Sequence, residues 1–80
     1  MKKQKLLKGE PVTIKNLVIG QAYYFDMASD ESGVYLGVDP NDNTTIMFAP
    51  IGKTTYGLLN GNVVFYNEEK EDFYFHLKAE

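Results

Sequence analysis

Three oxygen-bearing side chains, at Asp39, Asn41 and Asn43, have the residue types and spacing that open a calcium-binding loop. Carboxylate and amide oxygens at alternate positions are ligands that such a hard cation takes. The later positions do not fit, because Thr44 stands where the bend requires glycine and Pro50 where a bidentate glutamate is needed. Proline, asparagine and aspartate favour tight turns, so we predict a turn here and no metal site.

Another short motif, Gly52-Lys53-Thr54, is similar to the end of a phosphate-binding loop. Met47 occupies the position of the first glycine of that motif, and no helical pattern follows the threonine. We therefore predict a turn that carries a lysine, and no bound cofactor.

The side chains that could act as catalysts lack partners. His76 is the single histidine, and a general base needs a positioned partner. Ser29 and Ser32 lie in a polar stretch without the glycine-framed turn that exposes a nucleophilic serine. The paired carboxylates of residues 67–72 share one polar run, so they cannot flank a substrate. We predict that the protein is not an enzyme.

Length and composition describe a small β domain. The chain has 80 residues, of which 44% are hydrophobic and 14% aromatic, enough for one compact core. It has no cysteine, which excludes disulfides and thiolate ligands and predicts a cytoplasmic protein. Leu6-Leu7 is too short for the apolar centre of a signal peptide, and no stretch is long enough to span a membrane.

Charge is distributed unevenly along the chain. Residues 1–20 contain five lysines and one glutamate, whereas residues 21–80 contain three lysines and ten carboxylates. Arginine, the residue that most often reads guanine and phosphate, is absent. We expect residues 1–9 to form a basic, flexible leader and residues 10–80 to form one β domain.

Short β-branched and aromatic segments alternate with turn residues, which indicates an all-β, mostly antiparallel barrel or roll of five to six short strands. Asn60-Gly61 is a typical hairpin turn, and residues 39–43 form another. We expect Pro50 to end a strand and residues 67–72 to form a loop with one helical turn. The predicted strands cover residues 12–17, 21–27, 33–38, 44–49, 62–66 and 73–77, and a further strand is expected to end near Leu58-Leu59.

Alternation along these strands divides the side chains into an inward and an outward set. The outward set contains Tyr24, Tyr35, Tyr56, Tyr66, Tyr74 and His76. A shift of one residue in any strand would exchange its two sets. The expected core consists of Leu17, Ile19, Tyr23, Phe25, Val34, Leu36, Val38, Ile46, Phe48, Val63, Phe65, Phe73, Phe75 and Leu77.

The pattern of Leu17 and Gly20 before Tyr23-Tyr24-Phe25, followed by Gly33-Val34-Tyr35-Leu36-Gly37, resembles the first half of SH3-like or Tudor-like small barrels. The resemblance covers roughly residues 12–66 and implies that fold. The chain also resembles the small orphan proteins of tailed bacteriophages, because it is short, contains lysine but no arginine, and is expected to form a compact β body. That resemblance implies residence in the host cytoplasm.

These features favour a protein-binding module, in which exposed tyrosines meet the partner and an acidic rim attracts basic residues. A phage-type protein of this kind would modulate a host protein, and an open edge strand would allow self-association. The predicted partner-binding residues are Tyr24, Tyr35, Tyr56, Tyr66, Tyr74, Glu68 and Glu69, with Asp30, Glu31 and Glu71 completing the rim.

The alternative function is binding of a nucleotide or single-stranded nucleic acid, with tyrosines as stacking platforms and the leading lysines as phosphate contacts. A net charge of −3 opposes the approach of a polyanion, so we expect nucleic acid to be a poor partner. The acidic body suggests a further alternative, in which carboxylates mimic the phosphates of a nucleic acid.

Overall fold

The computed structural model describes residues 9, 11–26, 29–66 and 75–78 of the chain. Among them are seven strands, all in one sheet, and one short 3-10 helix. The elements are β1 (Pro11–Val12), η1 (Ile14–Asn16), β2 (Ala22–Tyr24), β3 (Ser32–Asp39), β4 (Asp42–Ile51), β5 (Leu58–Leu59), β6 (Asn62–Tyr66) and β7 (Phe75–Leu77).

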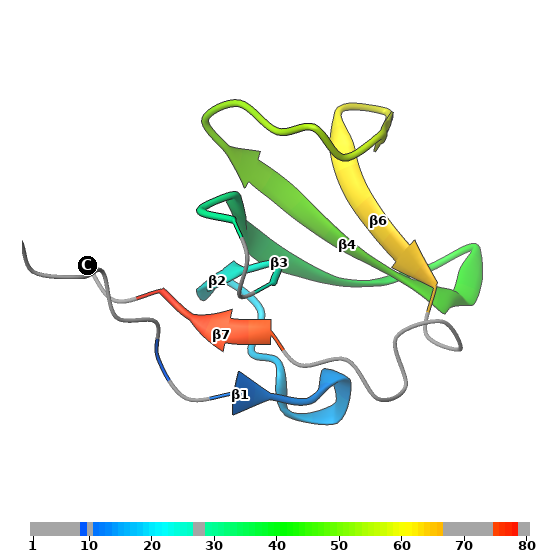
Figure 1. Ribbon diagram of the computed structural model, residues 1–80. Coiled ribbons are helices and arrows are strands. Elements are labelled where there is room, and N and C mark those ends of the chain that lie inside the picture. Colours follow the sequence, from blue (N-terminus) through cyan, green and yellow to red (C-terminus); the bar gives the residue numbers. More distant parts are fainter. Residues whose placement is uncertain (1–8, 10, 27–28, 67–74, 79–80) are drawn as a thin grey trace, which may run out of the picture.

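The strand order is β1-β7-β2-β3-β4-β6-β5, and every neighbouring pair is antiparallel. Figure 1 shows β1, β7 and β2 at one end of the curved sheet, with β4 and β6 at the other. The predicted all-β, mostly antiparallel class is confirmed. The sheet has seven strands, against the predicted five to six, and the short edge strands β1 and β5 lie where strands were expected, at Val12 and near Leu58-Leu59. The helical turn predicted within 67–72 lies outside the described residues.

Both predicted hairpin turns are present. Pro40 and Asn41 form the turn between β3 and β4, in which Asp39 pairs with Asp42. Asn60 and Gly61 join β5 to β6 with φ angles of 55° and 86°, the positive values that a type I′ turn demands.

Two predicted strand boundaries are wrong. Residues 12–17 do not form one strand, since η1 begins at Ile14 and its backbone closes through a bond from Asn16 N–H to the Thr13 carbonyl. Pro50 does not end β4 but pairs with Gly33 of β3. It is tolerated there because β6 pairs with β4 through residues 45–48 alone, so the missing N–H falls beyond that ladder.

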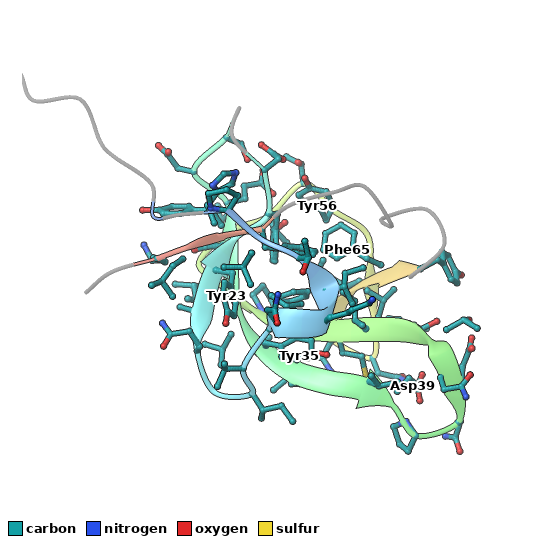
Figure 2. All side chains as sticks on the ribbon, turned by 90° about the horizontal axis from the view of Figure 1, so that it is seen from below. Tyr23, Tyr35, Asp39, Tyr56 and Phe65 are labelled. Atoms are coloured by element: carbon teal, nitrogen blue, oxygen red, sulfur yellow. The ribbon has the colours of Figure 1, made fainter. Side chains whose placement is uncertain are left out.

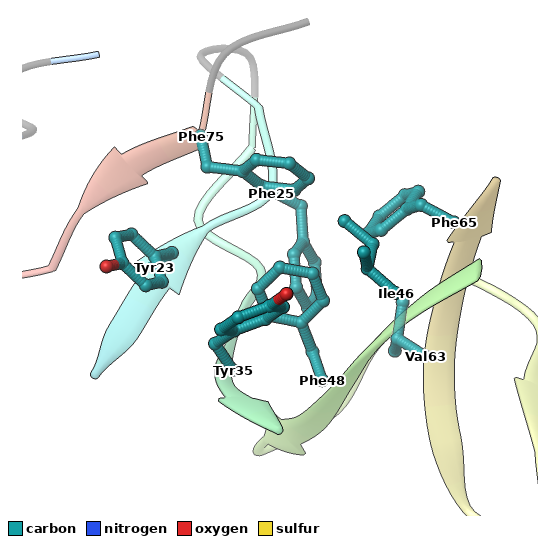
Figure 3. Packing of buried hydrophobic residues seen from close by; sticks show 8 residues of the cluster. All are labelled: Tyr23, Phe25, Tyr35, Ile46, Phe48, Val63, Phe65 and Phe75. Atoms are coloured by element: carbon teal, nitrogen blue, oxygen red, sulfur yellow. The ribbon is translucent and has the colours of Figure 1, made fainter. Parts of the chain in front are cut away.

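The core is a cluster of aromatic rings in the hollow of the sheet, shown in Figure 3. The Phe48 ring lies at its centre, with its centroid 5.3 Å from that of Phe25, 5.0 Å from Phe75 and 5.2 Å from Tyr35. Edge-to-face and tilted contacts of this kind add stability beyond burial alone. The cluster comprises Tyr23, Phe25, Tyr35, Ile46, Phe48, Val63, Phe65 and Phe75.

The predicted inward face of β3 is wrong. Tyr35 is buried, whereas Leu36 and Val38 are exposed. Gly33 lies on the same side as Tyr35, since a Cβ added there would stand 2.8 Å from Phe25 Cζ and 2.8 Å from the Ala49 carbonyl oxygen, and the pairing register shifts between Tyr35 and Gly37. A side chain larger than that of glycine would therefore not fit at position 33. Because this inward position has no side chain, the alternation of apolar and polar residues along β3 does not show which face is buried. Exposure of Ile19 and Leu77 also contradicts the predicted core, and Phe73 lies outside the described residues.

Candidate interaction surface

Of the four described tyrosines that were predicted to form a contact face, two are buried. Tyr24 and Tyr35 are 5% and 6% exposed, so their predicted exposure is wrong. Tyr66 is 52% exposed, as expected, and Tyr56 is half-buried. Burial also raises the pKa of the Tyr35 hydroxyl. Three further predicted contact residues lie outside the described part of the chain, namely Tyr74, Glu68 and Glu69.

Tyr56 has a structural role that its place in the sequence does not reveal. Its ring centroid lies 5.2 Å from that of Phe25 and 5.3 Å from that of Phe65. Figure 2 labels Tyr56 and Phe65. The Tyr56 hydroxyl donates a hydrogen bond to Asp26 Oδ2. Burial, and then this bond to a carboxylate, raise the pKa of Tyr56 well above its ordinary value. The residue fastens the loop after β4 to the core.

Glu31 secures the same loop from the solvent side. Its carboxylate accepts hydrogen bonds from Thr54 Oγ1 at 2.5 Å, Thr55 N–H at 2.8 Å and Thr55 Oγ1 at 2.8 Å. These bonds, that from the Thr54 hydroxyl first, hold the pKa of Glu31 below its ordinary value. The residue expected in an acidic rim thus positions the loop that contains Gly52-Lys53-Thr54.

Four exposed aliphatic residues are neighbours of Gly37 in the chain or of Ile19, which approaches it, and we call this set the Gly37 surface. Leu36 and Val38 flank this glycine along β3, and Ile19, preceded by Val18, lies against it. The exposed fractions are 61% for Val18, 68% for Ile19, 39% for Leu36 and 46% for Val38. Ile19, Leu36 and Val38 are expected in the core from the sequence pattern, and this expectation is wrong. An aliphatic residue type alone does not distinguish a buried position from an exposed one.

A tight turn positions Val18 and Ile19. The N–H of Gln21 donates to the Val18 carbonyl at 3.1 Å, and Gly20 has φ +92°, a value that favours glycine. The N–H of Gly20 then donates to the Tyr35 carbonyl, and that of Tyr35 donates to the Gln21 carbonyl. These bonds hold the turn against β3, which keeps Ile19 beside Gly37.

Gly37 itself shapes the surface. It has φ +107°, and the pairing of β3 with β4 shifts between Tyr35 and Gly37, which makes this a bulge. A Cβ added at Gly37 would stand 3.1 Å from Ile19 Cδ1. Both the backbone angle and the close approach therefore favour glycine at this position.

The acidic hairpin tip adjoins Val38. Asp39 Oδ1 accepts from the Asn41 N–H at 2.8 Å, and Asp42 accepts from Thr44 and Thr45. These bonds, that from the Thr44 hydroxyl first, lower the pKa of Asp42. Figure 2 shows Asp39 at this hairpin. The calcium-like residues Asp39 and Asn41 thus build a turn, as predicted.

The candidate catalysts are also involved in structural contacts. The Nδ1 atom of His76 lies 3.1 Å from the Gly9 carbonyl oxygen. Ser32 is buried within β3, and the Oγ of Ser29 accepts a bond from the Glu31 N–H. Over the described ranges, no three His, Cys, Asp or Glu side chains gather closely enough to hold a metal ion.

Comparison with protein-family models, with curated proteins and with solved structures found no match to this chain. In the part of the chain that the structure describes, no helix has the length and apolar character needed to cross a membrane.

Proposed function

We propose that this protein is a non-enzymatic binding module for another protein, and that the Gly37 surface is its contact site. The observation that carries the proposal is the high exposure of four aliphatic side chains around one glycine. Several exposed apolar side chains near one another on a small domain favour a binding site, because their contact with water is unfavourable.

The charge beside this surface favours a basic partner. Asp39 and Asp42 stand next to Val38, at the tip of the β3–β4 hairpin. Carboxylates at the rim of an apolar contact accelerate association with lysine- or arginine-rich surfaces. Since the chain resembles small bacteriophage proteins, we propose a host protein as the partner.

Burial of Tyr24 and Tyr35 removes two of the rings on which the nucleotide-binding alternative depends. A ring that is buried in the folded protein is not accessible to a base. The protein-binding proposal does not need these rings.

The test is an affinity capture from nuclease-treated lysate, in which bound proteins are quantified by mass spectrometry. The double variant Val18→Ser/Ile19→Ser removes half of the Gly37 surface without changing charge. Ile51→Ser is the matched control, because Ile51 is 41% exposed at the far end of the β3–β4 pair. We expect a protein that wild type and the control retain equally and that the double variant loses at least tenfold.

Equal capture by the double variant would refute the assignment of the Gly37 surface. Retention that disappears on nuclease treatment would instead support nucleic-acid binding. Wild type and both variants should give the same circular-dichroism spectrum and thermal midpoint, which shows that the fold is intact.

A further inference from the structure

The two edges of the sheet are protected to different degrees. At one edge, β1 begins with Pro11, which has no N–H to offer a neighbouring strand. At the other edge, β5 is flanked by Gly57 and Asn60 and contains neither proline nor charge. Charged residues and proline are the usual means of preventing edge-to-edge pairing, and within the described residues β5 has neither.

The register of the β5–β6 hairpin determines which backbone groups face outward. In a two-residue hairpin, the residues on either side of the turn form the hydrogen-bonded pair, here Leu59 and Asn62. At the next pair, Leu58 with Val63, the backbone groups of Leu58 point away from β6. One N–H and one C=O of Leu58 are therefore directed at the open edge.

The side chains of β5 add an apolar element to this edge. Leu58 and Leu59 are 53% and 54% exposed. Between residues 51 and 66, Lys53 is the single charged residue. An apolar, uncharged edge fits a second identical edge, because no opposite charge is required and none is left unpaired.

We propose that β5 is a self-association site, at which two copies of this chain pair their β5 strands antiparallel around a two-fold axis. Antiparallel pairing of a strand with itself is symmetric, so the contact is closed and does not extend into a fibre. The axis passes between the Leu58 residues of the two copies, whose N–H groups each donate to the other's carbonyl. This site shares no residue with the Gly37 surface, so each proposal stands without the other.

The contact is small. Two leucines and one exchanged pair of backbone hydrogen bonds from each copy fall below the roughly 1,600 Å² of a standard protein interface. We therefore expect a weak dimer that dissociates on dilution. Wild-type protein should show a mass that rises from monomer toward dimer over a hundredfold increase in concentration, measured by sedimentation velocity.

The variant Leu58→Pro removes the outward N–H while leaving the Leu59–Asn62 pair in place. We expect it to stay monomeric throughout the concentration range. Leu59→Lys is a second variant that keeps the backbone intact and introduces an edge lysine, and we expect it to weaken the dimer at least tenfold. A wild type that is monomeric at every concentration, or a dimer unaffected by both variants, would overturn the proposal.

Because the chain contains no cysteine, one introduced cysteine reports on the geometry. Hydrogen-bonded antiparallel neighbours have Cα atoms about 5.5 Å apart, within the range of a disulfide. Leu58→Cys should therefore form a disulfide-linked dimer under mild oxidation, visible on a non-reducing gel. Ile19→Cys, with 68% exposure at the Gly37 surface, is the control and should remain monomeric. Equal cross-linking of both variants would contradict pairing at β5.

Discussion

The Tyr56 hydroxyl donates a hydrogen bond to the carboxylate of Asp26, a residue 30 positions earlier in the chain. The bond joins the loop after β4 to the segment after β2, while the Tyr56 ring packs on Phe25 and Phe65. One side chain thus serves both the aromatic core and the polar contact between two loops.

Tyr56→Phe should destabilise the fold by about 1–3 kcal/mol, because the ring contacts remain and a charged hydrogen bond is lost. Chemical denaturation with urea measures the change. Tyr56→Ala is the comparison, and it should cost more because it also removes the ring from Phe25 and Phe65. Equal stability of Tyr56→Phe and wild type would show that the hydroxyl bond contributes nothing.

Alkaline unfolding provides an independent measure of the same hydroxyl. The pKa of Tyr56 is raised in the folded state, so its contribution is fully present below the ordinary tyrosine pKa of 10.0 and declines as pH rises above that value. We expect wild type to lose stability with rising pH more steeply than Tyr56→Phe. Tyr35, whose pKa is also raised, leaves a residual slope in the variant. Parallel stability curves for the two proteins would contradict this.

Acid should weaken the contact between Glu31 and the loop after β4. The pKa of Glu31 is lowered by hydrogen bonds from Thr54 and Thr55, so its contribution is present above the ordinary value of 4.5 and is lost as pH falls below it. Glu31→Gln lacks this dependence, and its stability should approach that of wild type as the solution is acidified. Asp42→Asn serves as a comparison at the hairpin tip, where the pKa is also lowered. A constant gap between wild type and Glu31→Gln would refute the assignment.

Gly37→Ala should be destabilising by more than about 1 kcal/mol, because alanine is strained at φ +107° and its Cβ approaches Ile19. Gly57→Ala is the matched control, since it has no neighbour within 4 Å and no positive φ. The double variant Gly37→Ala/Ile19→Ala relieves the contact and leaves the backbone strain. Thermal unfolding of these variants separates the two causes, and full rescue by the double variant would show that the backbone angle is unimportant.

Tyr35→Ser tests which face of β3 is buried. We expect a loss of roughly 3–5 kcal/mol, comparable to truncating a core aromatic, because Tyr35 packs 5.2 Å from Phe48. Tyr66→Ser should change stability by less than about 1 kcal/mol, since this side chain is half exposed. Similar effects of the two substitutions would contradict the register described for β3.

The parts of the fold that the sequence predicts are those that local chemistry determines. The turns at Pro40–Asn41 and Asn60–Gly61 need particular backbone angles, such as the positive φ values of Asn60 and Gly61. The residue types at these positions favour such angles and therefore predict the turns. Which face of β3 is buried is instead indicated by the close approach of Phe25 to Gly33. This is a tertiary contact that the sequence pattern does not reveal. Alternation predicts that the aliphatic residues of β3 point inward, because a glycine in a strand is usually taken to interrupt the pattern and not to mark a tight contact with the core.

The candidate surface was unpredictable for a related reason. Ile19 is as apolar as any core residue, and its exposure follows from a turn whose bonds run to Tyr35 on another strand. The predicted exposure of Tyr24 and Tyr35 is wrong because tyrosine serves equally well as a surface contact and as a buried ring with one satisfied polar atom. Tyr23 illustrates the second use, since it is 2% exposed and its hydroxyl accepts a bond from the Val18 N–H.

Strand β7 lies between β1 and β2, so this part of the sheet forms only when residues near the two ends of the described chain come together. The β3–β4 and β5–β6 hairpins pair residues close in sequence, and such contacts form within microseconds. Phe75 must instead find Val12, and Leu77 must find Tyr23, across most of the chain length. Long-range pairing of this kind slows folding, so we expect the two hairpins to form first and the β1-β7-β2 region to form last.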